Sequence, residues 1–228
     1  MIQLSLWNSL LDFLFPPHCP LCHAYVEGRG SWCPSCLQRG GGPHRLLLPA
    51  AGQRRIRFAW ALGGYRGYLR SLVHDLKYRR KKSILPYIDT YLRHVRENHL
   101  FLLPADLDVA VPVPLHAARE RERGFNQVEA IFARALSVRQ LPLERLLQRQ
   151  AVTQPLYRLT PGERRHVVQH AFSAAPGAAI AGRHILLLDD ILTTGTTATA
   201  CAEVLMAAGA SSVDVLVFAS DYGRQNCI

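Results

Sequence analysis

The sequence predicts an α/β protein, a parallel sheet flanked by helices, preceded by a small N-terminal domain built on four cysteines. Short apolar segments alternate with segments that carry apolar residues at helical spacing. This alternation is typical of strand–helix–strand units with parallel strands. Four of the six cysteines lie within 18 residues near the N-terminus, and the glycine run at 40–42 follows them. Because such a run interrupts regular structure, we expect domains at 1–45 and 46–228.

Composition limits the class of protein. The chain has 228 residues, which is enough for one to two domains of roughly 150 residues each. Apolar residues make up 49% and charged residues 19%, which excludes a disordered or fibrous chain. Lys and Arg number 27 against 17 Asp and Glu, and the resulting charge of +10 favours nucleic acids, phosphates or acidic membranes as partners. No apolar run reaches the roughly 20 residues that span a bilayer.

The N-terminal segment 4–15 is dense in apolar residues and predicts a short helix ended by Pro16 and Pro17. Packing on a neighbouring domain is the favoured interpretation, and docking to a partner or a membrane surface is the alternative. The segment lacks the basic face of a membrane-surface helix. It also lacks the Lys or Arg that precedes the apolar stretch of a signal peptide, so we expect a cytoplasmic protein.

The clustered cysteines form two C-x-x-C pairs, Cys19 with Cys22 and Cys33 with Cys36. Each pair bends the backbone so that two thiolates reach one ion, and two pairs complete the tetrahedron of a structural Zn²⁺ site. A domain of about 40 residues buries too little surface to fold alone, and zinc binding supplies the missing free energy. The sequence therefore predicts a closed, structural four-cysteine zinc site.

Other interpretations of the cysteines are weaker. Local disulfides fit poorly with a cytoplasmic protein, and two symmetric pairs argue against a redox role. His18 and His23 flank the first pair and are alternative ligands. We expect Cys201 to be a small core residue and Cys227 to lie in the tail.

The elements of the second domain follow from the periodicity of its apolar residues. We expect strands at 58–65, 109–113, 185–188 and 213–219, and helices at 68–78, 84–95, 126–138 and 197–208. Gly209 stops the last helix.

A second chemical pattern lies at 185–197, where a buried strand ends in two carboxylates and a loop rich in Thr opens a helix. Backbone N–H groups at a helix N-terminus bind phosphate, and Gly195 allows a close approach. Asp189 and Asp190 follow at the carboxyl edge of the sheet, where open α/β sheets bind ligands. Their oxygens suit vicinal hydroxyls, so the pattern predicts a site for a ribose that carries a 5′-phosphate. The P-loop and dinucleotide glycine motifs are absent.

This segment resembles the diphosphoribose-binding motif of the type I phosphoribosyltransferases. The resemblance implies a type I phosphoribosyltransferase-like sheet and phosphoribosyl diphosphate with Mg²⁺ as ligand. It also implies that Asp189 and Asp190 hold the ribose hydroxyls. The residues that would wrap the 5′-phosphate are Thr193, Thr194, Gly195, Thr196 and Thr197.

More of the chain is similar to the ComF family, including GntX-type proteins. The matching features are the four-cysteine knuckle, V-P-V-P-L at 111–115, R-G-F-N-Q at 123–127 and L-K-Y at 76–78. Family members are associated with natural transformation or with the use of DNA as a nutrient. The resemblance implies that Val113 and Pro114 belong to the pyrophosphate loop and that 153–168 is a mobile loop over the substrate.

The chain departs from the family at two positions. Val167 stands where the family usually has Asn, which puts a polar role there in doubt. Arg80 replaces a usual Gly, which adds positive charge.

Basic residues gather near the predicted phosphate site and are candidate contacts to the diphosphate or to a DNA backbone. These candidates are Lys77, Arg79, Arg80, Lys81, Lys82, Arg119, Arg121, Arg123 and Arg164. For any one group a solvated surface is the plainer interpretation. Tyr65, Tyr68 and Tyr78 are candidate stacking surfaces for single-stranded DNA, although core or edge positions are favoured for them.

Two functions remain open. One is an enzyme that transfers phosphoribosyl to an unknown acceptor, with Asp189 and Asp190 as its central residues, through positioning and charge. The alternative is a non-catalytic module that keeps the phosphate pocket and binds single-stranded DNA or DNA-processing proteins. The basic excess favours the module, whereas the intact pair of carboxylates favours the enzyme or a ligand sensor.

Overall fold

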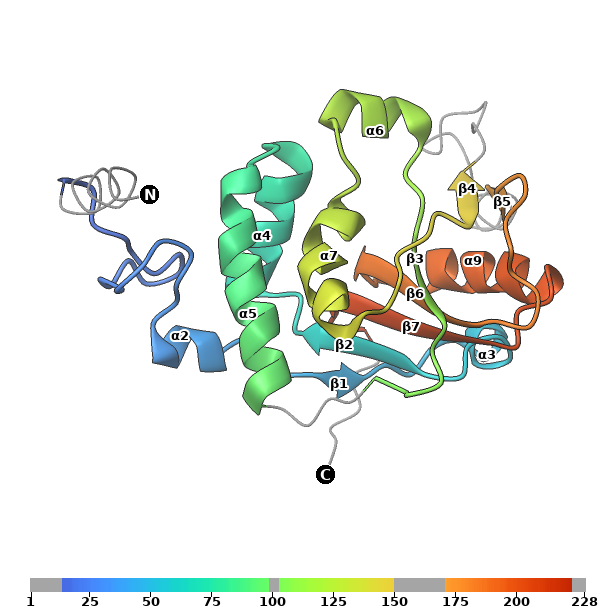
Figure 1. The fold of residues 1–228 in the computed structure, drawn as a ribbon. Coiled ribbons are helices and arrows are strands. Elements are labelled where there is room, and N and C mark those ends of the chain that lie inside the picture. The colour runs from blue at the N-terminus through green and yellow to red at the C-terminus, as the bar shows by residue number, and fades with distance from the viewer. Residues whose placement is uncertain (1–13, 99–102, 150–170, 223–228) are drawn as a thin grey trace.

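The computed structural model describes residues 14–98, 103–149 and 171–222. Its centre is a five-stranded sheet in the order β1-β2-β7-β6-β3 (Figure 1). The strands are β1 (His44–Arg45), β2 (Ala59–Gly63), β3 (Val109–Pro112), β6 (His184–Ile191) and β7 (Ser212–Ala219). All neighbouring pairs are parallel except β1 with β2. The predicted α/β class with a mostly parallel sheet is confirmed.

Helices cover both faces of this sheet, as long runs of Val, Leu and Ile in parallel strands require. One face carries α4 (Gly67–Tyr78), α5 (Leu85–Asn98) and α7 (Gln127–Arg139), and the other carries α9 (Thr196–Ala207) and the short α3 (Ala50–Gln53) (Figure 1). The alternation of side chains along the strands divides the core in two. Leu186 and Leu188 of β6 pack with the first set of helices, and Ile185 and Leu187 pack with the second.

The strands and helices predicted for 46–228 all occur, with small shifts at their ends. The strand predicted at 185–188 is longer, because β6 continues through both carboxylates and pairs Asp189 with Val217 and Ile191 with Ala219. Helix α7 begins where Asn126 Oδ1 accepts a hydrogen bond from Val128 N at 2.9 Å. Helix α9 is followed by Gly209 with φ +92°, as the expected stop requires.

Several elements were not predicted. They are the short helices α2 (Pro34–Gln38), α3 and α6 (Ala117–Arg123), the 3₁₀ helix η1 (Lys82–Ile84), strand β1, and a separate antiparallel pair of strands, β4 (Leu147–Arg149) and β5 (Phe172–Ala174). Each is short and lacks apolar periodicity, so a sequence pattern does not reveal it.

The cysteine knuckle packs against the main body through α4 and α5, and its helix α2 (Pro34–Gln38) carries the last cysteine. Trp32 lies 4.5 Å from Tyr68, centroid to centroid, and its indole N–H donates to the Tyr87 carbonyl at 2.8 Å. Cys19 and Cys36 join the core cluster formed by these helices. The helix predicted at 4–15 lies almost wholly outside the described residues.

Candidate functional site

The four predicted cysteine ligands meet at one point. The Sγ atoms of Cys19, Cys22, Cys33 and Cys36 all lie within 4.8 Å of one another. Zn–S bonds of about 2.3 Å in a tetrahedron place sulfur atoms about 3.8 Å apart. The Cys22 and Cys33 sulfurs are separated by 3.6 Å, so the four residues fit one zinc ion.

The electrostatics of the knuckle differ between its cysteines. The Ser35 hydroxyl, 3.4 Å from the sulfur, lowers the pKa of Cys33 to about 6. Burial raises the pKa of Cys36 to about 12. A bound cation would stabilise the thiolate form of all four cysteines and so remove the difference between the pKa values of Cys33 and Cys36. This is the expected behaviour of a structural site that depends on its metal.

The second site lies at the carboxyl end of β6, where the chain turns into α9. Gly195 is the N-cap residue of α9 with φ +74° and makes no side-chain cap. Thr193 and Thr194 are exposed, and the Thr194 and Thr196 hydroxyl oxygens lie 2.9 Å apart. The first N–H groups of the helix and several hydroxyls therefore face the same loop, an arrangement suited to an anion.

The two carboxylates at this site are not equivalent. Successive residues of a strand point to opposite faces, so Asp190 faces α4 and α7 while Asp189 faces the α9 side. Asp190 is 2% exposed and Asp189 is half-buried. Burial raises the pKa of Asp189, and the charge of Asp190 raises it further, against the opposing effect of Lys77.

Asp190 is held by residues from three motifs that are far apart in the sequence. Lys77 Nζ lies 2.8 Å from its Oδ1, and the Gln127 side-chain amide donates to its Oδ2 at 2.8 Å. The Arg123 guanidinium donates in turn to the Gln127 side-chain oxygen. The L-K-Y, R-G-F-N-Q and Asp-Asp segments therefore converge on one buried carboxylate.

Asp189 has different neighbours. The Asp190 backbone N–H donates to its Oδ1 at 2.8 Å. The charge of Asp189 acts on Arg149 of β4 and on Cys201 of α9. Arg149 stacks over the Phe172 ring at 5.3 Å, and its buried Nε has no hydrogen-bond partner among the described residues. Burial raises the pKa of Cys201, which is fully buried as expected.

The segment predicted to form the pyrophosphate loop lies next to this carboxyl end. The Val113 backbone N–H donates to the Leu188 carbonyl at 2.8 Å, one residue before the carboxylates. The Asn126 amide donates to the Val113 carbonyl at 3.4 Å. Pro114 is half-buried and leads into α6.

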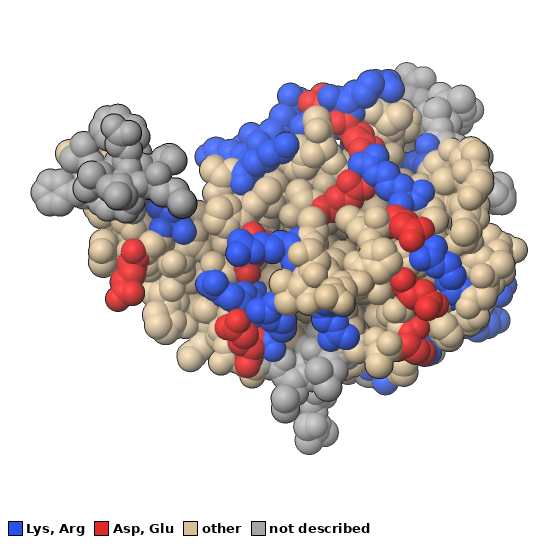
Figure 2. Space-filling model, viewed as in Figure 1, with Lys and Arg blue, Asp and Glu red and all other residues tan. Residues whose placement is uncertain are grey.

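The predicted basic contacts fall into two groups. Lys77 and Arg123 join the Asp190 cluster described above. Arg80, Arg119 and Arg121 are exposed, and Arg80 reaches Glu122 of α6 at 2.9 Å. Figure 2 shows a band of Lys and Arg over α6 and the adjoining end of α4. The run at 79–82 contributes Arg79, Lys81 and Lys82, of which Arg79 pairs with Asp75 at 3.3 Å and Lys82 lies over the Phe125 ring at 4.7 Å.

Some predicted residues do not serve a ligand site. Tyr68 is buried in the core and cannot stack on DNA, whereas Tyr78 is exposed beside the basic run. Arg164 and the predicted mobile loop at 153–168 lie outside the described residues.

Two residues of the site were missed by the sequence interpretation. In the sequence, Gln127 stands out only as the last residue of R-G-F-N-Q. Its place at the first position of α7, directly after the Asn126 cap, is the signal that could have assigned it to the site. Arg149 precedes no recognisable pattern. Strand β4 places Arg149 opposite Phe172 of β5, within range of the Asp189 charge.

Comparison with known proteins bears on both sites. Residues 10–41 match the family described as Double zinc ribbon domain. The chain is 29% identical over 215 residues to the DNA utilization protein YhgH of Escherichia coli (strain K12), covering 86% of this chain and 87% of that protein. It is 22% identical over 205 residues to Competence protein F of Haemophilus influenzae, covering 87% and 82%. The resemblance to the ComF family is confirmed.

Solved structures similar to the chain include phosphoribosyltransferases. For hypoxanthine phosphoribosyl transferase of Trypanosoma cruzi the TM-score is 0.35 at 15% identity, covering 70% of this chain and 69% of that one. For the glutamine phosphoribosylpyrophosphate amidotransferase of B. subtilis the TM-score is 0.33 at 22% identity, covering 48% of this chain and only 22% of that one. TM-scores this low support no argument about function. Among the described residues no helix is both long and apolar enough to cross a membrane.

Proposed function

We propose that this ComF-type protein binds phosphoribosyl diphosphate at the β6–α9 loop and acts in the uptake or use of DNA. The observation that carries the ligand assignment is the convergence of Lys77, Gln127 and Arg123 on Asp190, beside the N-terminus of α9, whose N-cap residue is Gly195. The role in DNA use rests on the names of the relatives, YhgH and Competence protein F.

The chemistry of the loop supports a phosphate ligand. The N–H groups of the first turn of α9 and the hydroxyls of Thr193, Thr194, Thr196 and Thr197 offer donors to a 5′-phosphate. Gly195 lets the ligand approach the backbone. Asp189 and Asp190 supply acceptors for ribose hydroxyls, and carboxylates are oxygen ligands of the kind that Mg²⁺ prefers. Asp189 and Asp190 would hold Mg²⁺, which would offset the negative charge of the diphosphate when bound.

In a transfer reaction the protein's part would be positioning and charge. The bond between C1′ and the diphosphate breaks, and a bond from C1′ to the acceptor forms. The loop would hold the 5′-phosphate and the carboxylates would hold the ribose, and the exposed Arg119 and Arg121 of α6 are candidates to bind the leaving diphosphate. No protein nucleophile is required.

Thermal unfolding tests the ligand assignment. Saturating phosphoribosyl diphosphate with Mg²⁺ should raise the melting temperature by several degrees, because a ligand at about 100 times its Kd stabilises by about 2.7 kcal/mol. Asp189→Ala with Asp190→Ala should abolish the shift. Thr193→Val with Thr194→Val should reduce it with little effect on the apo protein, since both side chains are exposed. Thr90→Val on α5 serves as the matched control. A wild-type protein with no shift would refute the assignment.

The alternative function, a module that binds single-stranded DNA, is favoured by the basic band of Figure 2 and by the exposed Tyr78. Binding through backbone phosphates weakens steeply as salt rises. We therefore expect affinity for an oligo-dT to fall by about a hundredfold or more between 50 and 200 mM salt, and Arg119→Glu with Arg121→Glu to weaken it at any salt. Equal affinity at both salt concentrations would refute a backbone-driven mode.

A further inference from the structure

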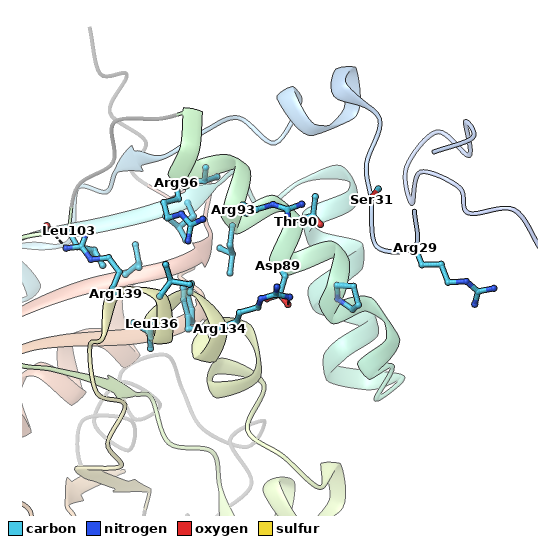
Figure 3. Close-up of a pocket in the computed structure, with 18 residues that line it drawn as sticks. Arg29, Ser31, Asp89, Thr90, Arg93, Arg96, Leu103, Arg134, Leu136 and Arg139 are labelled. Carbon is cyan, nitrogen blue, oxygen red and sulfur yellow. Dashed lines mark hydrogen bonds and ion pairs between the residues drawn. The ribbon is translucent and has the colours of Figure 1, made fainter. Parts of the chain in front are cut away.

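A cavity of about 400 Å³ lies between α5 and α7, with its floor on the sheet (Figure 3). None of the residues 189–197 lines it, so it is separate from the proposed phosphoribosyl site. Its volume falls in the range of pockets that bind ligands or anchor side chains.

The floor and walls of the cavity are apolar. Leu62 of β2 and Leu216 of β7 form the base, and side chains of the two helices form the walls. The wall residues are Leu92 and Val95 of α5 and Phe132, Ala135 and Leu136 of α7. Val138 at the edge is 58% exposed, which is unusual for a large apolar side chain and extends the apolar surface outwards.

The rim of the cavity is strongly basic. Five arginines line it, all of them exposed: Arg29, Arg93, Arg96, Arg134 and Arg139. Asp89 is the one acidic residue among the lining residues, and it pairs with Arg134 at 3.4 Å. Arg96 pairs with the adjacent Glu97 at 3.2 Å. The charge around the opening is therefore positive by several units, and the arginines of both helices face one groove.

We propose that this groove docks an acidic segment of a partner protein. An apolar side chain of the segment would occupy the cavity, and its carboxylates would pair with the arginines on the two rims. Arginine suits this role because its planar guanidinium pairs with carboxylates in bidentate geometry. Amphipathic segments that lie in a groove between elements are a recurring mode of peptide recognition.

The shape of the surface favours a peptide over a small anion. Figure 3 shows Arg93, Arg96, Arg134 and Arg139 spread along the groove, whereas Arg29 lies on the N-terminal segment with its side chain directed away from them. A compact anion would meet only part of this row, whereas an extended or helical segment would meet all of it.

The composition of the surface favours a peptide over single-stranded nucleic acid. Binding of single strands relies on exposed aromatic rings on which bases stack. The aromatic residue of the lining is Phe132, which is 1% exposed and presents no ring face. The rest of the apolar lining is aliphatic, which suits Leu or Phe side chains of a peptide.

Fluorescence anisotropy with the full chain and a labelled acidic peptide, Asp-Asp-Leu-Glu-Asp-Leu-Phe-Glu, tests the proposal. We expect saturable binding that weakens with salt, and no binding of matched peptides in which Lys replaces the acids or Ser replaces Leu and Phe. Arg93→Glu with Arg139→Glu, one exposed arginine from each wall, should weaken binding by at least about tenfold. The control is Arg54→Glu with Arg55→Glu, two exposed arginines after α3 on the opposite face, which should leave the affinity within about twofold.

Ala135→Trp tests the cavity itself, because it fills the groove without a change of charge, and it should also remove binding. Circular dichroism and thermal unfolding check that each variant folds. If Ala135→Trp does not fold, the arginine variants alone test the proposal. Three results would overturn the proposal: no saturable binding of the acidic peptide, binding that survives the Arg93 and Arg139 changes, or binding of oligo-dT that is tighter than that of the peptide and is lost on the Arg93 and Arg139 changes. The last result would make the groove a nucleic-acid site.

Discussion

Asp189 and Asp190 are neighbours in sequence and opposites in environment, because each residue of a strand faces away from the next. Asp190 accepts from Lys77 and Gln127 in the core between α4 and α7. Asp189 lies on the α9 side, where burial and the charge of Asp190 raise its pKa. The Asp189 charge acts on Arg149, but no ion pair joins the two side chains among the described residues, so Asp189 is available to a cation that would arrive with the proposed ligand.

This difference predicts opposite effects of two adjacent substitutions. Asp189→Asn should stabilise the apo protein at neutral pH by about 1 kcal/mol, because it removes a carboxylate that burial and the charge of Asp190 disfavour. Asp190→Asn should destabilise it, because Lys77 and Gln127 lose a charged acceptor. Urea unfolding of both variants beside the wild type measures the two signs. Destabilisation by both would contradict the unequal environments.

Because the pKa of Asp189 is raised, the effect of Asp189→Asn on the free energy of unfolding should depend on pH. The folded wild type binds the Asp189 proton more tightly than the unfolded chain, whose pKa is the ordinary 3.8. Protonation of Asp189 therefore stabilises the folded state. This stabilisation is complete below pH 3.8 and is lost as the pH rises through the raised pKa of Asp189 in the folded protein. The advantage of Asn over Asp should therefore be small at about pH 4 and larger at about pH 8.

Among the elements, β6, α4 and α7 meet at Asp190, and none of the three defines that site alone. Lys77 lies in the last turn of α4, and Gln127 is the first residue of α7. Packing of both helices on one face of the sheet brings them to the end of β6. The L-K-Y and R-G-F-N-Q segments therefore have a structural meaning as supports of one carboxylate.

This junction predicts coupling between α4 and β6. Lys77→Met should destabilise the fold by about 3 kcal/mol, because it leaves the buried Asp190 carboxylate without its cation. Lys77→Met with Asp190→Leu should be less destabilised than the sum of the single variants, as a double-mutant cycle in urea would measure. Lys81→Met, at an exposed position just beyond α4, is the control and should change the stability by less than about 0.5 kcal/mol. Strict additivity would refute a direct pair.

For the whole molecule, the knuckle and the sheet share one core. Cys19, Cys36 and Trp32 pack with α4 and α5, and Gly30 and Gly40 lie against Pro86 and Tyr91 with no room for a Cβ. The zinc site therefore stabilises more than its own loop. The zinc site also holds in place the side chains of the knuckle that pack on α4 and α5.

Removal of the metal should accordingly loosen this contact. A chelator should lower the melting temperature and shift the fluorescence of Trp32 to the red, because its ring leaves Tyr68 and its N–H loses the Tyr87 carbonyl. Added Zn²⁺ should restore both signals. The change in emission should be absent in Trp32→Phe, which assigns it to this residue. Metal-free protein with unchanged melting and emission would contradict a structural role.

The sequence by itself determined the class of fold, the four cysteine ligands and the strand, loop and helix expected between 185 and 208. These features depend on the spacing of residues that are near one another in the sequence, and this spacing can be read without a structure. It also led to the ComF resemblance through motifs whose order along the chain can be read without a structure.

Only the tertiary structure decided which carboxylate is supported, that Arg149 lies near Asp189, and that an arginine-rimmed cavity opens between α5 and α7. Each depends on residues separated by tens of positions and brought together by helices packing on a sheet. The apolar periodicity of α5 and α7 predicts that both bury a face, but it does not say how closely the two helices approach. Their separation, and so the groove between them, follows from the side chains that fill the space over β2 and β7.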